Sequence, residues 1–145
     1  MKTNELMVAD WVLKRERDHY LPVRIIAIYE DNVDWKFRNT EGVITVNGIK
    51  PIPVTAEILQ ANGFENYKYS RRCSIWLNRE DFDNHTEIDY RIDQNWFDLK
   101  KMANRRYIFQ LKCEVYYVHE LQHLLRAAGL NEMADSFVVK EGGFQ

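Results

Sequence analysis

The first fifty residues consist of short apolar and β-branched runs separated by turn signals, and this spacing restricts the fold more than any other feature. Four runs show the pattern, at residues 11–14, 22–29, 32–37 and 43–46. Their Val, Ile, Trp and Phe content is typical of β-strands. Asn47-Gly48 is a tight-turn signal. Because short strands protect their edges best by closing or curling, we predict a small SH3-like β-barrel or curled sheet over residues 1–53.

A short helix is predicted directly after this module. Pro51 and Pro53 stiffen the chain before it, and Thr55 is a favourable cap for a helix over residues 56–62. Gly63 is suited to end the helix in a left-handed conformation. We therefore expect residues 54–66 to connect two modules.

The second half of the chain predicts an antiparallel sheet followed by helices. Strand-like runs occur at residues 67–77, 86–92, 95–100 and 105–115. Residues 116–137 then carry the helical pattern and are expected to form a helical hairpin that packs on this sheet. The predicted fold class is α+β, with the second module spanning residues 67–145 and the two modules able to share one core.

The first helix of the hairpin has a clear apolar side. Leu121, Leu125 and Ala128 recur at helical spacing and Gly129 follows them, so a helix should run from about residue 118 to that glycine. At about 100° per residue, His119 and His123 fall on the opposite side. We expect them to lie on a solvated polar face.

The same two histidines belong to the only catalytic-looking motif, H-E-x-x-H at residues 119–123. In zinc proteases this spacing places two imidazole ligands on one helix face, while the glutamate activates a zinc-bound water. His119 and His123 would be the ligands here and Glu120 the general base. A third ligand from downstream could come only from Glu132 or Glu141, neither of which is well placed. A small zinc hydrolase is thus the alternative hypothesis, with zinc as its cofactor.

A second candidate site interleaves aromatic and basic side chains. Its residues are Tyr67, Lys68, Tyr69, Arg71 and Arg72. Aromatic rings stack on bases and cationic groups bind phosphates, so this pattern suits single-stranded nucleic acid. The alternative interpretation is a strand edge protected by charge against pairing with another chain.

Composition restricts the partners and the compartment. The formal net charge is −2, which gives no general attraction to duplex DNA. No signal peptide and no apolar run of membrane-spanning length is found, so we expect a cytoplasmic protein without membrane contact. Cys73 and Cys113 form no C-x-x-C or metal-knuckle pattern and are expected to be reduced thiols. An exposed strand edge in the second module would suit a homodimer.

Three segments carry a resemblance to a known family: residues 6–12, residues 49–64 and residues 117–124. In these segments the chain resembles an uncharacterised family of short hypothetical proteins from Bacteroidetes genomes, prophages and mobile elements. The resemblance implies a phage or mobile-element setting and transfers no catalytic residue. Our leading hypothesis is a non-enzymatic accessory protein that needs no cofactor and binds a host protein, single-stranded nucleic acid or a small anionic ligand.

Overall fold

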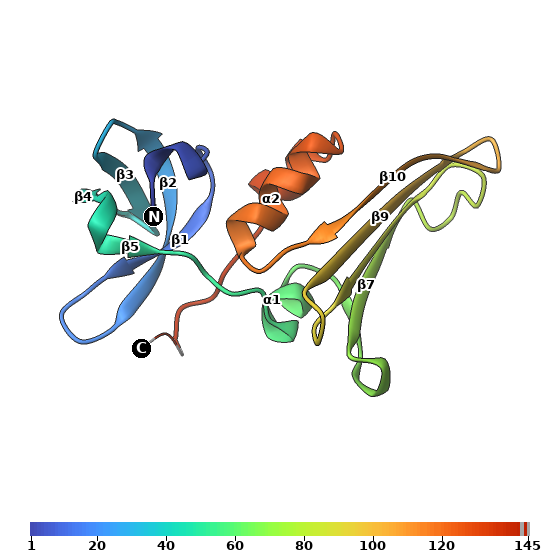
Figure 1. Ribbon diagram of the computed structural model, residues 1–145, viewed down its shortest axis with the longest axis horizontal. Coiled ribbons are helices and arrows are strands. Elements are labelled where there is room, and N and C mark those ends of the chain that lie inside the picture. The colour runs from blue at the N-terminus through green and yellow to red at the C-terminus, as the bar shows by residue number, and fades with distance from the viewer. Residues whose placement is uncertain (143, 145) are drawn as a thin grey trace. The chain divides into compact units, whose positions relative to one another are not determined.

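The computed structural model describes residues 1–142 and 144, and it has the α+β architecture that the sequence predicts (Figure 1). The chain forms two compact units, each built around a five-stranded antiparallel sheet. One unit contains Met1–Pro53 together with Tyr117–Gln145, and the other contains Val54–Tyr116. Within the described residues, no helix is long and apolar enough to cross a membrane.

The first unit contains a sheet in the order β4-β3-β2-β1-β5. Its strands are β1 (Trp11–Arg15), β2 (Tyr20–Ile28), β3 (Asn32–Phe37), β4 (Thr40–Thr45) and β5 (Ile49–Lys50). Two single 3-10 turns, η1 (Thr3–Glu5) and η2 (Val46–Gly48), precede β1 and β5. The four predicted runs therefore correspond to β1 to β4.

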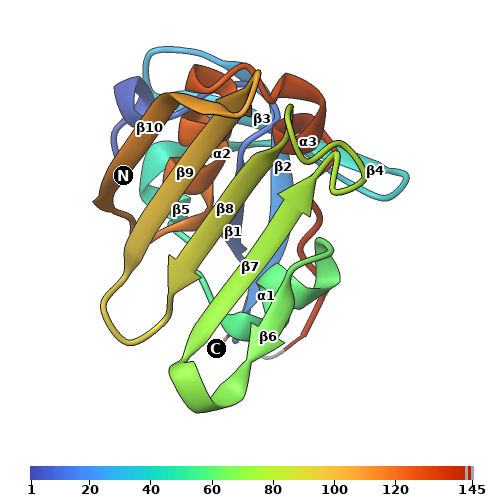
Figure 2. The same cartoon turned by 90° about the vertical axis from the view of Figure 1, so that its right-hand side faces the viewer.

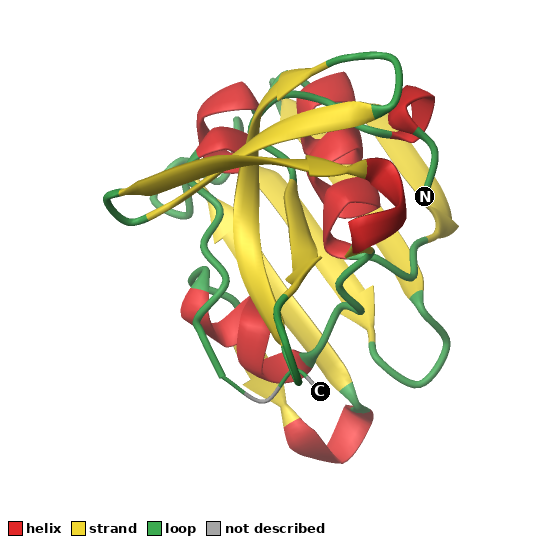
Figure 3. Ribbon diagram, turned by 90° about the vertical axis from the view of Figure 1, so that its left-hand side faces the viewer, coloured by secondary structure: helices red, strands yellow, loops and turns green. Residues whose placement is uncertain are grey.

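This sheet is curled and not closed, because β4 and β5 remain its edges (Figure 3). Its inner face buries Val12, Val23, Ile25 and Val33 completely, and Trp35 packs with them. The indole of Trp35 lies so close to Gly42, its partner on β4, that a Cβ there would come within 2.7 Å of the ring. Glycine is thus required at position 42 because the Trp35 ring leaves no room for a side chain, and not because the backbone conformation demands it.

The C-terminal helices α2 (Val118–Ala127) and α3 (Asn131–Asp135) belong to the first unit. We expected them on the second sheet, in a module over residues 67–145; instead, α2 contacts β1. Gly129 ends α2 with φ of +80° as predicted, and the Leu130 amide donates to the Leu125 carbonyl at 2.8 Å. The difference arises because α2 is positioned by polar contacts to the N-terminal segment. The helical periodicity of apolar residues does not reveal such contacts.

The second unit begins with the predicted connecting helix, α1 (Ala56–Ala61). The Thr55 hydroxyl accepts a hydrogen bond from the Ile58 amide at 3.2 Å, as expected of a capping residue. Gly63 follows with φ of +91°, and a Cβ on it would touch the Ile75 side chain. α1 therefore lies on the face of the second sheet that carries Ile75.

The second sheet has the order β10-β9-β8-β7-β6, and Figure 2 shows the five strands side by side. Its strands are β6 (Glu65–Tyr67), β7 (Arg72–Leu77), β8 (Thr86–Arg91), β9 (Trp96–Ala103) and β10 (Arg106–Glu114). A register shift interrupts the pairing of β10 with β9 between Tyr107 and Phe109. In Figure 2 no other element of this unit covers the face turned toward the viewer.

The two ends of the second unit are adjacent. The Val54 amide donates to the Tyr116 carbonyl at 3.0 Å. One residue outward, in the first unit, Pro53 and Tyr117 form an isolated antiparallel bridge, and the Val118 amide donates to the Ile52 carbonyl at 2.8 Å. The second unit is thus an insertion into the first.

Candidate functional site

The aromatic-basic stretch does not form the continuous strand that we predicted over residues 67–77. β6 ends at Tyr67, a single 3-10 turn η3 (Lys68–Ser70) follows, and β7 begins only at Arg72. Arg71 adopts φ of +51° at the turn. No Gly or Asn announces this turn, which is why the sequence pattern missed it. The five predicted residues are therefore divided between a hairpin tip and the two strands that flank it, and they do not form one stripe.

Two of the five residues nevertheless come together. Tyr67 and Arg72 are directly opposite on β6 and β7, and the Arg72 guanidinium lies 5.1 Å from the centre of the Tyr67 ring. Tyr69 is fully exposed at the tip. Lys68 and Arg71 also lie in the turn, away from the row that Arg72 begins.

Arg72 belongs to a row of side chains that crosses the open face of the second sheet. It pairs with Arg91 on β8, which pairs with Trp96 on β9. The neighbouring row contains Ser74, Asp89 and Asp98 in the same register. Because residues directly opposite one another point to the same face, these rows form one surface. That surface lies opposite the face of Ile75 and α1.

Two adjoining hollows of about 420 and 450 Å³ lie along this surface and share Arg72 and Asp89. We call them together the sheet groove. Its lining residues are Tyr67, Arg72, Ser74, Trp76, Arg79, Phe82, Glu87, Asp89, Arg91, Gln94, Trp96, Asp98, Lys100 and Lys112. Five of them are basic and three are acidic, which gives the groove a net charge of +2 within a chain whose net charge is −2.

The acidic side chains lie in the middle of the groove. Asp89 and Asp98 are opposite one another on β8 and β9, and Arg72 lies 3.5 Å from the Asp89 carboxylate. Partial burial raises the pKa of Asp89, an effect that Arg72 opposes and Asp98 reinforces. Asp98 accepts a hydrogen bond from Gln110 at 3.2 Å. These carboxylates are hydrogen-bond acceptors flanked by cationic groups.

Aromatic side chains lie at both ends of the groove. Trp76 stacks on His85 with ring centres 5.0 Å apart and planes 10° apart, and the Phe82 ring, 72% exposed, meets Trp76 edge-on. Trp96 lines the other hollow. His85 is buried and bonds the Glu87 carboxylate at 2.9 Å, a contact that raises the pKa of His85. The contact with Glu87 fixes His85, the stacking partner of Trp76.

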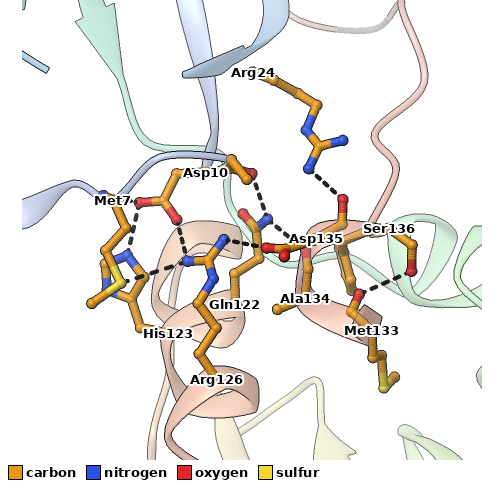
Figure 4. Close-up of polar contacts among 12 residues, drawn as sticks. Met7, Asp10, Arg24, Gln122, His123, Arg126, Met133, Ala134, Asp135 and Ser136 are labelled. Atoms are coloured by element: carbon orange, nitrogen blue, oxygen red, sulfur yellow. Dashed lines mark hydrogen bonds and ion pairs between the residues drawn. The ribbon is translucent and has the colours of Figure 1, made fainter. Parts of the chain in front are cut away.

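The polar face of α2 differs from our expectation. His119 is 6% exposed and Gln122 is fully buried, so the predicted solvated face is covered. The segment just before β1, the start of β1 and α3 together cover it. The Gln122 amide accepts from the Trp11 amide at 2.9 Å and donates to the Ala9 carbonyl at 3.0 Å. It also donates to the Ala134 carbonyl at 3.0 Å (Figure 4). A glutamine with all these partners behaves as a core residue, which an apolar periodicity cannot detect.

Asp10 is the centre of this polar cluster, although our sequence analysis did not select it. Its carboxylate is fully buried and binds His123 Nε2 at 2.7 Å and Arg126 Nη1 at 2.9 Å (Figure 4). It also accepts from the Met7 amide at 2.8 Å. These partners are what a buried carboxylate requires. The one signal available in the sequence was the position of Asp10 immediately before an apolar strand.

The motif residues line a smaller pocket of about 360 Å³ in the first unit. Its walls include Glu5, Tyr117, His119, Glu120 and His123. Burial lowers the pKa of His119, which favours the neutral imidazole. Its Nδ1 is buried and has no hydrogen-bond partner among the residues that the structure describes.

Glu120 has a structural task that the hydrolase hypothesis did not foresee. It occupies the third position of α2, and its carboxylate accepts from the Tyr117 amide at 3.0 Å as part of a capping box. Across residues 1–142 and 144, no three His, Cys, Asp or Glu side chains already converge as metal ligands. Zinc hydrolysis through Glu120 stays a hypothesis.

Comparison with protein-family models, with curated proteins and with solved structures finds no match for this chain.

Proposed function

We propose that this chain is a non-enzymatic binding protein that holds single-stranded nucleic acid in the sheet groove. The observation that carries the proposal is the combination of aromatic rings with an excess of basic side chains on one uncovered sheet face. In a single strand the bases are available for stacking, and each stacked base contributes about 1–3 kcal/mol.

The charge arrangement supports the same ligand. Lys100 and Lys112 line one hollow and Arg79 lines the other, so cations are present in both parts of the groove. Asp89 and Asp98 lie between them and would accept hydrogen bonds from exocyclic amino groups of bases. A phosphate backbone would then follow the basic side chains while base edges face the two carboxylates.

The resemblance to prophage and mobile-element proteins extends the proposal to an accessory role in such an element. A zinc hydrolase that uses the H-E-x-x-H motif remains the alternative hypothesis. Its general base would be Glu120, which already caps α2. For these reasons the groove is the site to test first.

Binding is measured by fluorescence anisotropy with labelled dT20, dA20 and the matching RNA oligomers, at several salt concentrations. We expect the affinity to fall with salt by about 0.7 decade per decade for each neutralised phosphate. Lys100→Gln combined with Lys112→Gln should lower that slope by about 1.4. Phe82→Ala, at an exposed site, should weaken binding by the loss of one stacked base, about 1–3 kcal/mol.

Lys36→Gln combined with Lys140→Gln is the matched control, because it removes the same charge from the first unit. Both lysines are exposed, and Lys36 makes only a long ion pair of 3.8 Å with Glu41. If no oligomer binds in a salt-dependent way, or if the groove and control variants bind alike, the proposal fails.

A further inference from the structure

The outer edge of β10 is long enough to accept another strand. β10 is the last strand of the second sheet, and within the described residues no strand pairs with its outer side (Figure 2). It has nine residues, whereas β6 at the opposite edge has three. The amide and carbonyl groups along the open side of such a strand are a template for a further chain.

The direction of the backbone groups shows which residues of β10 would pair. The Val115 amide donates to the Asn95 carbonyl at 2.8 Å, so the backbone of Val115 faces the side of β9. Backbone direction alternates along an antiparallel strand. Gln110, Lys112 and Glu114 therefore direct their amide and carbonyl groups away from β9, and these groups form a regular row at the edge.

The side chains of β10 are apolar for an exposed edge. Tyr107, Ile108 and Phe109 are 58%, 65% and 40% exposed. Strand edges are usually protected by charges, by proline or by a bulge. Here the register shift disturbs the edge only between Tyr107 and Phe109, and between Phe109 and Glu114 the one charged residue is Lys112. This part of the edge is suited to burial.

The charges at the two ends of β10 identify a second copy of the chain as the partner. The strand begins with the cationic Arg106 and ends with the anionic Glu114. A second copy running antiparallel would place each acidic end beside a basic end. A parallel copy would place like charges side by side, which destabilises strand pairing. The edge is therefore complementary to itself in the antiparallel direction.

The register of this pairing follows from the same residues. With Leu111 on the two-fold axis, Gln110 lies opposite Lys112 of the second copy, and Phe109 lies opposite its Cys113. Gln110 and Lys112 are both outward residues, so each such pair exchanges two backbone hydrogen bonds. An axis at Lys112 would place two lysines opposite one another. An axis at Gln110 would bring the register shift after Tyr107 into the pairing.

From these observations we propose that two copies of the chain pair antiparallel through β10, with Leu111 on the two-fold axis. Each copy contributes five strands, so the two sheets become one continuous sheet. The axis is perpendicular to that sheet, and the open faces of both copies therefore lie on the same side. Lys112 lines the sheet groove, so the dimer joins the two grooves into one longer surface. Pairing through β10 needs no nucleic acid and is independent of the proposed function.

The first test is sedimentation equilibrium of the unchanged, tag-free chain over a hundredfold range of concentration, in reducing buffer without nucleic acid. We expect a reversible monomer–dimer equilibrium. Leu111→Lys places two ammonium groups opposite one another on the axis and should weaken the dimer by about tenfold. Val43→Lys is the matched control, because Val43 is 65% exposed on β4, an edge strand of the first sheet. It should dimerise as the unchanged chain does.

Disulfide crosslinking tests the register and does not depend on the folding of the lysine variant. Leu111→Cys and Gln110→Cys are compared under mild oxidation, each in a Cys113→Ser background. Leu111 would be a non-hydrogen-bonded position across the axis, where Cα atoms are about 4.5 Å apart and a disulfide can form. We expect Leu111→Cys to crosslink faster than Gln110→Cys, whose neighbour across the axis is Lys112.

Three results would overturn the proposal. An unchanged chain that stays monomeric at every concentration would leave the edge of β10 to an extended segment of another protein. Equal dimerisation of the Leu111→Lys and Val43→Lys variants would place the interface elsewhere. Faster crosslinking of Gln110→Cys than of Leu111→Cys would refute the register.

Discussion

Replacing Gln122 by Leu tests whether the polar cluster, and not apolar packing alone, attaches α2 to the first sheet. The side chain is fully buried, and its amide satisfies the Trp11 amide and the carbonyls of Ala9 and Ala134. Leu has nearly the same size but offers no hydrogen bond. The substitution therefore leaves the Trp11 amide and the Ala9 carbonyl unpaired, while the Ala134 carbonyl keeps only a long bond of 3.4 Å from the Phe137 amide. It does so without opening a large cavity.

The expected magnitude follows from the two groups left unpaired. Each buried group left without a partner costs about 1–3 kcal/mol, so a middle value gives about 4 kcal/mol in total. Burial of the more apolar Leu side chain returns about 2 kcal/mol. We expect the free energy of unfolding to fall by about 2 kcal/mol, measured by urea denaturation followed by tryptophan fluorescence and circular dichroism.

Two further variants make this test specific. Gln122→Glu keeps the shape and the acceptor for Trp11 but places a carboxylate against two carbonyl oxygens, so it should destabilise more than Leu does. Gln60→Leu changes an exposed glutamine of α1 and should alter stability by less than about 0.5 kcal/mol. A loss below about 1 kcal/mol for Gln122→Leu would refute the reasoning.

Three other substitutions have defined outcomes. Gly42→Val should destabilise the first sheet by about 1–3 kcal/mol in urea denaturation, because its Cβ would come within 2.7 Å of the Trp35 ring, whereas an unchanged unfolding midpoint would contradict that contact. His85 has a raised pKa through Glu87, so its stabilising contribution is complete below the unfolded pKa of about 6.5 and is lost as pH rises through the folded pKa. Unfolding free energies measured across that interval should decline with pH, and His85→Gln should flatten the decline. Asp10→Ala should cost about 3–5 kcal/mol by the same denaturation assay, because it leaves the partly buried Arg126 and His123 without their carboxylate partner, and a near-neutral result would argue against these contacts.

Local chemistry explains which parts of the fold could be predicted. Helix ends could be predicted because the residues that cap them are neighbours in sequence. Thr55 caps the start of α1, Gly63 follows its end, and Gly129 follows the end of α2. The same holds for the strands of the first unit, whose turns and apolar runs are local. By contrast, η3 interrupts a stretch in which tyrosines alternate with basic residues, and no Gly, Asn or Pro between Tyr67 and Arg72 signals the turn.

The candidate sites depend on contacts that are distant in sequence, which is why they were predicted only in part. His123 was selected by its motif, but its partner Asp10 lies 113 positions away. Tyr67 and Arg72 were selected as one stripe, whereas the groove also recruits Trp76, Trp96 and other residues from separate strands. Sequence spacing finds residues that share an element, and it does not find those brought together by strand register.

The insertion of Val54–Tyr116 between the two parts of the first unit sets an order in which the chain can fold during synthesis. The second sheet has every one of its strands once Glu114 is made. The sheet of Met1–Pro53 is made earlier. However, the Trp11 amide has its acceptor only after Gln122 has been synthesised. The unit that is started first is therefore finished last, and until α2 is made its β1 region lacks the partners that cover it, a condition that favours aggregation.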